Sequence, residues 1–410
     1  MRSPITEPPW RRVDVPPAAP LTGRVTADVA IVGAGLTGLA TAYYLISRDP
    51  SLDVVLLDAG RPGAGASGRG TGLLGPRVGP AIDKARRRYG DETARACYEA
   101  SVGWVRQVVR LAGDLGADCG LTTGGQLMVA NSPRAAEALA RQADAYRELG
   151  LDPAPLPDPG RFRAALRFPV AATLDPAALV AALAAEVAGR GVRRFDHSPV
   201  RSLGAGELVL PYGTVRARRT VVAVNGFVRS LALPVGTVAP LEVHAVATAP
   251  LPAALRAELG PEPVIDVTPL APYYRLTPQG RLVMGGGPVN GRAERAWAWL
   301  AERLPGGTEV THRWSGRIGM TGDDLPVVGE AVPGVWFAGG CCGHGLALSV
   351  ASGAYLADAL LGEAPPPLPW HRARAPWLPT AGPARPVLEA YLRLLTRRAA
   401  RDGAALRFST

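Results

Sequence analysis

The sequence predicts a mixed α/β fold in which a parallel-sheet domain is joined to a second, mostly antiparallel sheet, an α+β insert. Two observations carry this prediction: a strand–helix–strand pattern between residues 28 and 57, and a quick succession of strand-like segments between residues 219 and 338. A chain of 410 residues exceeds what one hydrophobic core usually organises, so we expect two intertwined domains. Its 47% of apolar residues excludes wholesale disorder.

The first unit begins at residues 28–32, a continuous apolar run typical of a strand buried on both faces in a parallel sheet. We expect a helix over about 37–47 and a second buried strand over 54–57. These three elements form a βαβ unit. The proline-rich residues 1–24, around Trp10, predict an extended arm that lies across the body.

The remaining elements follow from periodicity and from turn residues. Residues between about 85 and 150 have helical spacing, interrupted by a strand-like segment at 124–130, and a helix from Pro176 to near Arg190 has Asp175 as its expected N-cap. Further strands are expected over residues 219–224, 241–248, 273–276, 281–285 and 335–338. A proline cluster at 364–369 indicates a linker before a short basic helix over 387–400.

Charge and cysteine usage exclude several function classes. Lys84 is the only lysine among 45 basic residues, so arginines account for the formal net charge of +10. They are scattered along the chain, which favours a solvated surface over a nucleic-acid site. The four cysteines form no C-x-x-C pair and have no partnering histidine cluster, so we expect no metal, no disulfide framework and a cytoplasmic location.

No membrane span or secretion signal is expected. The N-terminal residues include Glu7, Asp14 and several prolines in place of a basic stretch followed by an apolar core. The apolar run 25–46 is interrupted by Asp28 and by glycines in a turn pattern. It therefore indicates a strand, a turn and a helix rather than a transmembrane segment.

A dinucleotide-binding fingerprint lies between the first predicted strand and helix. Gly33, Gly35 and Gly38 give G-x-G-x-x-G, in which the first glycine permits a tight turn. The second lets the backbone approach a pyrophosphate, and the third lets helix and strand pack closely. The helix N-terminus supplies free N–H groups for the anion, and Asp58, at the end of the next strand, is placed to bind ribose hydroxyls.

Further segments distinguish between the cofactors that share this fingerprint. Residues 63–69 read G-A-G-A-S-G-R, residues 221–226 read V-V-A-V-N-G, and residues 336–340 lead into Gly343-His344-Gly345 before a helix. With these motifs, residues 25–362 resemble the D-amino-acid-oxidase-like FAD flavoproteins, and among them the γ-glutamylputrescine-oxidase-like and sarcosine-oxidase-like branches. The resemblance implies a Rossmann-type FAD-binding domain and a mostly antiparallel-sheet substrate domain.

The same resemblance implies a division of the chain and a set of FAD contacts. The FAD domain would comprise 1–78, 160–235 and 311–363, the substrate domain 79–159 and 236–310, and residues 364–410 the linker and basic helix. The expected FAD contacts are Gly33, Gly35, Leu36, Thr37, Gly38, Asp58, Ala59, Ser67, Gly68, Arg69, Val200, Asn225, Gly226, Gly340, Gly343, His344 and Gly345.

Each group of these residues has an expected role. Ser67 and Arg69 would lie beside the pyrophosphate and the flavin ring, and the backbone of Val200 would meet the adenine. The turn before the last helix would direct a positive helix end at the flavin pyrimidine, which stabilises the reduced ring. His344 is expected at the flavin, as an electrostatic group or as a packing residue. One departure from the family pattern is Gly70-Thr71-Gly72, where the γ-glutamylputrescine-oxidase-like branch has Asn-Gly-Gly.

Ile318 marks a second departure. In sarcosine-oxidase relatives a cysteine at this place attaches the flavin covalently, and in glycine-oxidase relatives an arginine there binds the substrate carboxylate. An apolar side chain does neither, so we expect a non-covalent FAD and a substrate without an α-carboxylate. Arg317 is one residue away and offers an alternative cation if the alignment shifts.

A third departure concerns oxygen. Sarcosine-oxidase-like enzymes use a lysine above the flavin to activate O2, whereas this chain has Val283 at that position. Either Arg275, Arg281 or His244 takes this role, or the electrons pass to another acceptor.

The resemblance therefore implies oxidation of an amine C–N bond to the imine, with hydride transfer to flavin N5 and O2 as the acceptor that yields H2O2. A desolvating pocket would keep the amine neutral. Tyr273 and Tyr274 are the candidates for lining it and, with His344, for catalysis, while Trp314 and Met320 would cover the ring. The alternatives are a dehydrogenase with a non-oxygen acceptor and a non-catalytic flavin-binding subunit that docks through helix 387–400.

Overall fold

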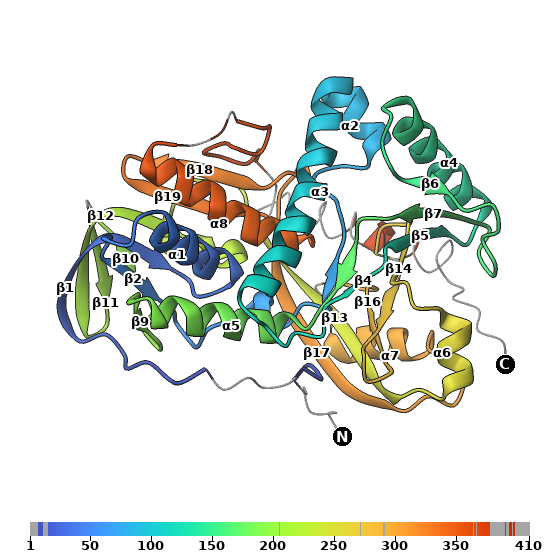
Figure 1. The fold of residues 1–410 in the computed structure, drawn as a ribbon, viewed down its shortest axis with the longest axis horizontal. Coiled ribbons are helices and arrows are strands. Elements are labelled where there is room, and N and C mark those ends of the chain that lie inside the picture. Colours follow the sequence, from blue (N-terminus) through green and yellow to red (C-terminus); the bar gives the residue numbers. More distant parts are fainter. Residues whose placement is uncertain are drawn as a thin grey trace.

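The structure is a computed structural model that describes residues 7–10, 15–204, 206–270, 272–289, 292–363, 365, 367–377, 390, 393–395 and 397. Two eight-stranded sheets lie side by side, and a small three-stranded sheet lies between them (Figure 1). The small sheet comprises β3 (Leu73–Leu74), β4 (Thr122–Thr123) and β8 (Ala172–Thr173). The predicted mixed α/β class is confirmed.

Parallel strands form the centre of the first sheet. They are β19 (Val335–Gly339), β12 (Gly213–Val222), β1 (Gly23–Val32), β2 (Val54–Leu57) and β9 (Arg193–Phe195), in that spatial order. Three further strands pair antiparallel at the margin: β10 (Ser202–Leu203), β11 (Glu207–Leu210) and β18 (Val327–Val332).

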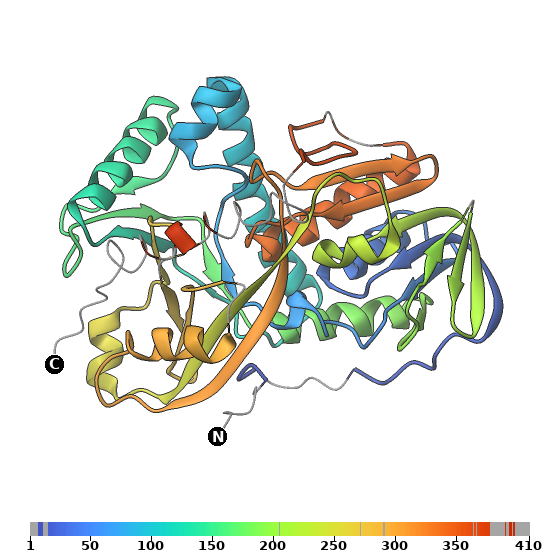
Figure 2. The same ribbon diagram turned by 180° about the vertical axis from the view of Figure 1, so that it is seen from behind.

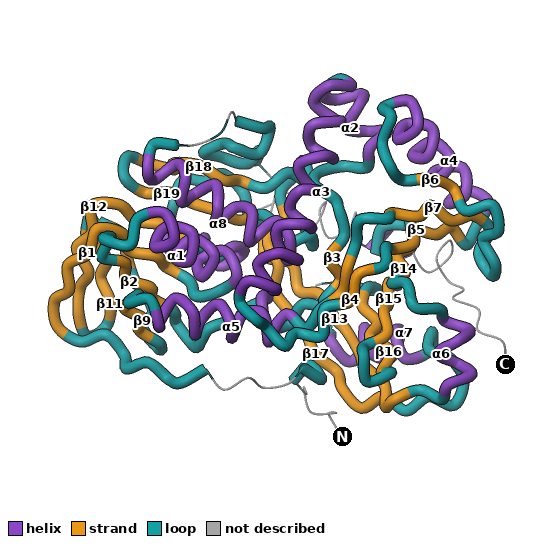
Figure 3. The backbone as a smooth tube through the Cα atoms, viewed as in Figure 1, coloured by secondary structure: helices purple, strands orange, loops and turns teal. Residues whose placement is uncertain are grey.

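Alternating side chains of β1 separate the two faces of this sheet. Val29 and Ile31 pack against the helices α1 (Leu36–Arg48), α5 (Pro176–Gly189) and α8 (Gly345–Leu361), which cover one face (Figure 3). Ala30 and Val32 belong to a separate cluster on the opposite face. A strand buried on both faces has the continuous apolar sequence that residues 28–32 show.

The second sheet is mostly antiparallel, as predicted. Its spatial order is β17 (Val310–Met320), β13 (Ala239–Pro250), β16 (Arg281–Gly285), β15 (Tyr273–Leu276), β14 (Val264–Asp266), β5 (Gln126–Ala130), β7 (Ala164–Phe168) and β6 (Ala154–Pro155). Only the β14–β5 pair within this order is parallel. Seen from behind, the long strands β13 and β17 run beside each other along the edge (Figure 2).

The other helices in the described ranges are α2 (Ile82–Tyr89), α3 (Asp91–Asp114), α4 (Pro133–Glu148), α6 (Ala253–Leu259) and α7 (Ala293–Ala301). α3 packs against α8, and its residues Val105, Val108 and Leu111 belong to the core of the first sheet. Two 3-10 turns, η1 (Ala66–Gly68) and η2 (Asn225–Leu231), lie at the ends of strands of the first sheet. The predicted cap of α5 is present, because the Asp175 side chain accepts hydrogen bonds from Ala177 N and Ala178 N.

The predicted strands and helices within the described residues are found, with shifted boundaries. β1 begins five residues before the predicted start, at Gly23, and β17 and β18 were not predicted as strands. β7 and β17, which the predicted division assigns to the FAD domain, pair within the second sheet. The domain boundaries themselves stay a prediction.

Two predictions concern regions at the ends of the chain. Most of the predicted helix 387–400 lies outside the described residues. Trp10, in the N-terminal arm, packs edge-on against Trp314, with ring centroids 6.1 Å apart. Within the part of the chain that the structure describes, no helix is both long and apolar enough to cross a membrane. The cytoplasmic location stays a prediction.

Candidate functional site

One large cavity extends from the loop after β1 to the second sheet. Its volume is about 2410 Å³, and its walls include the 58–72 segment, strands β13 and β17 and the turn before α8. Small-molecule pockets are usually about 300–1,000 Å³. The cavity therefore has room for an extended dinucleotide and a substrate together.

Glycines shape the loop between β1 and α1 because neighbouring atoms leave no space for side chains. A Cβ atom at Gly38 would lie 1.8 Å from Gly33 O, and one at Gly33, whose φ is +109°, would lie 2.7 Å from Ala223 O. A Cβ at Gly35 would lie 2.9 Å from Ser67 Oγ. Gly33 and Gly35 line the cavity, whereas Gly38 is buried against the loop, where it allows helix and strand to pack.

The start of α1 is prepared for an anion. No side chain caps the helix at Gly35, and Ser67 Oγ accepts a hydrogen bond of 2.9 Å from Leu36 N. Ser67 thereby joins the 63–69 loop to the helix N-terminus. The first-turn N–H groups and the helix dipole at this end suit a pyrophosphate.

Asp58 lies at the end of β2, at the edge of the cavity. Its carboxylate accepts hydrogen bonds of 2.7 Å from Ala34 N and from Gly60 N. Burial raises the pKa of Asp58, and these two backbone N–H groups oppose the rise. The bonds fix the carboxylate beside the glycine loop, where a ribose would reach it. Val200 lines the same part of the cavity.

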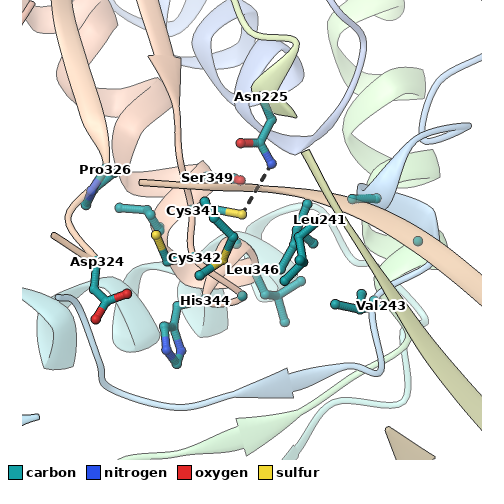
Figure 4. Close-up of a pocket in the computed structure, with 18 of the residues that line it drawn as sticks. Asn225, Leu241, Val243, Asp324, Pro326, Cys341, Cys342, His344, Leu346 and Ser349 are labelled. Carbon is teal, nitrogen blue, oxygen red and sulfur yellow. Dashed lines mark hydrogen bonds between the residues drawn. The ribbon is translucent and has the colours of Figure 1, made fainter. Parts of the chain in front are cut away.

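A second ordered turn lies directly before α8, at the other end of the cavity from the glycine loop. The Asn225 side chain accepts from Gly340 N at 2.9 Å and donates to Cys341 Sγ at 3.3 Å (Figure 4). Cys342 has a positive φ of 49°, and its thiol lies 3.4 Å from Thr321 Oγ1. Asn225 therefore holds the turn before α8 in place. The two cysteine side chains therefore have different partners.

These features fit FAD, whose long shape needs a pyrophosphate site and a ring site in one cavity. The glycine loop and α1 form the first, and the N-terminus of α8 forms the second. Gly343, His344 and Gly345 line the cavity there, and no side chain caps the helix at His344. A free helix N-terminus beside the ring stabilises negative charge on it.

His344 is a neutral imidazole at neutral pH. Burial, with a contribution from the nearby Arg77 guanidinium, lowers the pKa of His344 to about 3. The expected position beside the ring stays a prediction, but a role as a fixed cation does not agree with this pKa. A neutral imidazole acts as a hydrogen-bond donor or acceptor.

The two adjacent tyrosines of β15 lie on opposite faces of the second sheet. Tyr273 lines the cavity over Gly285 of the neighbouring strand, and burial raises the pKa of its hydroxyl. Tyr274 is only 1% exposed, packs in the core of the second sheet and is hydrogen-bonded to Arg161. The prediction that Tyr274 lines the pocket is therefore wrong, because successive side chains of a strand alternate between faces.

β13 and β17 form an apolar wall. Leu241, which points into the pocket in Figure 4, is the cross-strand partner of Ile318, and both residues line the cavity. The next pair in the register, Glu242 and Arg317, carries opposite charges. The Arg317 guanidinium also lies over the Phe227 ring, 5.3 Å from its centroid. Arg317 is thus directed toward Phe227, while Ile318 is directed toward Gly343 in the turn before α8.

Three residues were proposed as the cation that serves oxygen. Arg275 is 2% exposed and donates to the carbonyl oxygens of Thr71 and Leu174, and Arg281 donates to Thr248 O. Neither lines the cavity. His244 does line it, but burial lowers its pKa and leaves it neutral. Val283 is buried in the core beside Trp314.

Most of the residues predicted to bind FAD gather around the cavity. The residues that line it are Gly33, Gly35, Leu36, Thr37, Asp58, Ala59, Ser67, Arg69, Val200, Asn225, Gly343, His344 and Gly345. The predicted residues that do not line it are Gly38, Gly68, Gly226 and Gly340. A Cβ at Gly68 would lie 2.6 Å from Gly63 O, and one at Gly226 would lie 2.9 Å from Ile318 O. These glycines therefore allow segments to approach each other and do not face a ligand.

Sequence reasoning missed several residues that face the cavity, Gln126 and Arg77 among them. Gln126, at the start of β5, is 5% exposed, and its Oε1 atom has no hydrogen-bond partner among the described residues. The sequence offered one indication of Gln126: it is a single amide residue at the start of an otherwise apolar strand, Gln126–Ala130. Arg77 lines the cavity from an exposed loop, and nothing in the sequence distinguishes it from the other arginines.

Metal ions have no evident site in the described ranges, where no three His, Cys, Asp or Glu side chains gather.

Comparison with known proteins gives a match over most of the chain. A family model described as FAD dependent oxidoreductase, DAO, matches residues 28–359. The probable oxidoreductase OrdL of Rhizobium meliloti (strain 1021) is 28% identical over 380 residues, which cover 86% of this chain and 88% of the relative. The gamma-glutamylputrescine oxidoreductase of Escherichia coli (strain K12) is 28% identical over 368 residues, which cover 84% of this chain and 86% of the relative.

Solved structures share the fold. Glycine oxidase from Geobacillus kaustophilus superposes with a TM-score of 0.71 at 23% identity, covering 86% of this chain and 98% of its own. L-proline dehydrogenase from P. horikoshii superposes with a TM-score of 0.68 at 17% identity, covering 86% of this chain and 97% of its own.

Proposed function

The chain belongs to the DAO family of FAD-dependent oxidoreductases, and from this premise we propose that it oxidises the C–N bond of an amine to the imine, with O2 as the electron acceptor. One observation carries the proposal: a single cavity joins the dinucleotide loop, the α8 turn and the apolar wall of β13 and β17. A substrate against this wall lies at the ring end of the cofactor site.

The substrate class is supported by the nature of the wall. Bound FAD accepts a hydride from the carbon next to the substrate nitrogen. The nitrogen needs a free lone pair for this, so the pocket must favour the neutral amine over the ammonium. Leu241 and Ile318 disfavour a charge through desolvation, which lowers the pKa of a bound ammonium. The names of two relatives, gamma-glutamylputrescine oxidoreductase and glycine oxidase, point to nitrogen-bearing substrates.

Polar side chains around the wall position the amine. Gln126 Oε1 is a buried acceptor without a partner among the described residues, and it suits a substrate N–H group. Tyr273 presents its hydroxyl over Gly285, at the wall of the same cavity. His344, at the start of α8, is neutral. It orients groups at the ring by hydrogen bonding, and the positive end of the helix is left to stabilise the charge on the ring. We assign positioning roles to these three residues, and a hydrogen bond to the reacting nitrogen to Gln126.

One observation favours a second candidate, a dehydrogenase with a quinone or protein acceptor. Oxygen activation commonly depends on a positive charge close to the reduced ring. Arg275 and Arg281 bind backbone carbonyl groups away from the cavity, and His244 is neutral. Arg69 is a further cation that lines the cavity, and its guanidinium donates to the backbone oxygen of Ser315, whose hydroxyl is hydrogen-bonded to His244. Our proposal of O2 as acceptor relies on Arg69.

Product analysis in air tests both the reaction and the acceptor. Each amine consumed should require one O2 and one water, and should yield one carbonyl product, one ammonia and one H2O2. Oxygen uptake and peroxide should rise together with the carbonyl product. If the carbonyl product forms only with an added quinone or dye, and no peroxide appears, the dehydrogenase is correct. Arg69→Gln should slow re-oxidation by O2 with little effect on reduction by the amine.

A further inference from the structure

Exposed cations surround the mouth of the cavity on the side of the second sheet. They come from four separate segments of the chain: the loop before α2, α2 itself, α4 and the start of α7. We call this set the basic rim; it consists of Arg77, Lys84, Arg134, Arg141, Arg292 and Arg295. All six line the cavity and are exposed to solvent, so they lie where the cavity opens.

The basic rim differs from other arginines on the same helices by having no partners. Within the described part of the chain, none of its six side chains forms an ion pair or a hydrogen bond. Arg86, Arg87 and Arg147, which do not line the cavity, are each paired with a carboxylate. The helices thus neutralise the arginines that are directed outward and leave those that face the cavity unpaired.

Two of the carboxylates that line the cavity already have partners. Asp83 is paired with Arg87 at 3.3 Å, and Asp266 accepts from Asn131 Nδ2 and from Thr268 N, both at 2.7 Å. Asp324 lies at the opposite end, beside the α8 turn (Figure 4). The opening is therefore strongly positive, which attracts anions and concentrates them at the entrance.

Arg77 connects the rim to the ring end of the site. Its charge acts on His344 at the start of α8 and on Tyr146 of α4, and all three residues line the cavity. Arg134 and Arg141 are seven residues apart on α4, which places them on one face of the helix, toward the cavity. A ligand anion between Arg77 and α4 would meet cations from two sides.

We propose that the substrate is an amine that carries a carboxylate or similar anionic group several bonds from the reacting nitrogen, and that Arg77, Arg134 and Arg141 bind this distant group. The inference rests on the proposed amine oxidation. It adds a binding site for the distant anionic group to the site that holds the reacting nitrogen. The apolar wall accepts the connecting chain and Gln126 binds the nitrogen. The arginines give the anion paired, charge-assisted hydrogen bonds.

Matched probes test this. In one member of each pair a primary amine is linked by an alkyl chain to a carboxylate, as in 6-aminohexanoate, and in the other the carboxylate is an uncharged amide, as in 6-aminohexanamide. Shorter and longer homologues complete the series. The FAD-loaded full-length enzyme should show a kcat/KM that is roughly tenfold or more higher for the carboxylate at the best chain length. The advantage should fall as salt concentration rises.

Variants assign the effect. Arg77→Gln and the double variant Arg134→Gln/Arg141→Gln should lose most of the preference for the carboxylate, measured as the ratio of kcat/KM for the carboxylate to kcat/KM for the amide. Arg147→Gln is the matched control, since Arg147 lies on α4 but pairs with Asp144 at 2.7 Å and does not line the cavity. If Arg77→Gln does not fold, two measurements still test the proposal. They are the carboxylate-to-amide ratio of kcat/KM in the wild type and the same ratio in the Arg134→Gln/Arg141→Gln variant, whose substituted residues are exposed.

The outcomes separate this inference from the proposed function. Reduction of the flavin by both members of every pair at equal efficiency would overturn the inference and leave amine oxidation standing. Absence of reduction by any amine would overturn both. An unchanged ratio in the rim variants, together with slower transfer of electrons to an acidic protein acceptor, would make the rim a docking surface and the proposal wrong.

Discussion

Gly35→Val should yield a folded protein without FAD. A Cβ at this position would lie 2.9 Å from Ser67 Oγ, and the two further methyl groups of valine would enter the cavity at the start of α1. Both the link between Ser67 and Leu36 and the approach of the pyrophosphate to the helix N-terminus would be lost. We expect at least a hundredfold weaker binding, on the order of 3 kcal/mol or more. The measurement is the amount of FAD per chain after purification.

Gly103→Val is the matched control for this substitution. Gly103 lies on α3, and a Cβ there would meet nothing within 4 Å. This variant should keep its FAD, and circular dichroism should give the same helix content for both variants and the wild type. Normal FAD occupancy in folded Gly35→Val would show that the loop is not the phosphate site. Acid precipitation of the wild type should release FAD into the supernatant; colour in the pellet would contradict the non-covalent attachment inferred from Ile318.

Amines without an α-carboxylate should be better substrates than the corresponding α-amino acids. The reacting carbon must lie at the ring end, where Leu241 and Ile318 form the wall. A carboxylate on that carbon would be desolvated against these side chains, at a cost of several kcal/mol when it has no partner. A penalty of about 3 kcal/mol corresponds to roughly a hundredfold in kcat/KM. The measurement compares amino acids with their decarboxylated amines.

Arg317 is the side chain that most directly opposes this expectation. In the structure it is the cross-strand partner of Glu242, and its guanidinium lies over the Phe227 ring. Arg317 lines the cavity as Ile318 does, but its charged end is directed toward Phe227. Higher kcat/KM for the amino acids throughout the panel would refute the expectation. Loss of that preference in Arg317→Ala would then identify the arginine that binds the carboxylate, whereas Ile318→Arg should create such a preference in an enzyme that lacks it.

The sequence was most informative where a local pattern determines local structure. The run from residue 28 to 32, the three glycines and Asp58 predicted the strand, the turn and the ligand-facing carboxylate, because each depends on neighbours in the chain. Asp175 before Pro176 likewise predicted the helix start. The family resemblance then supplied the cofactor, which the fingerprint alone leaves open between FAD and NAD.

What the sequence could not give depends on contacts between distant segments. Tyr273 and Tyr274 are equivalent in composition, and only the register of β15 against β16 decides which one faces the cavity. Asn225 bonds to the turn before α8, 115 residues away, so its position depends on the packing of β12 beside β19. The neutrality of His344 arises from burial, and the basic rim from four segments that meet only in the folded chain.

Anaerobic mixing of the FAD-loaded protein with an amine is the most direct measurement of the central claim. The visible absorbance of oxidised flavin should disappear when 6-aminohexanoate or its amide is added without oxygen, and should remain when the amino group is replaced by hydroxyl. Persistence of the oxidised spectrum with every amine, in a protein whose flavin a chemical reductant does bleach, would contradict amine oxidation at this site.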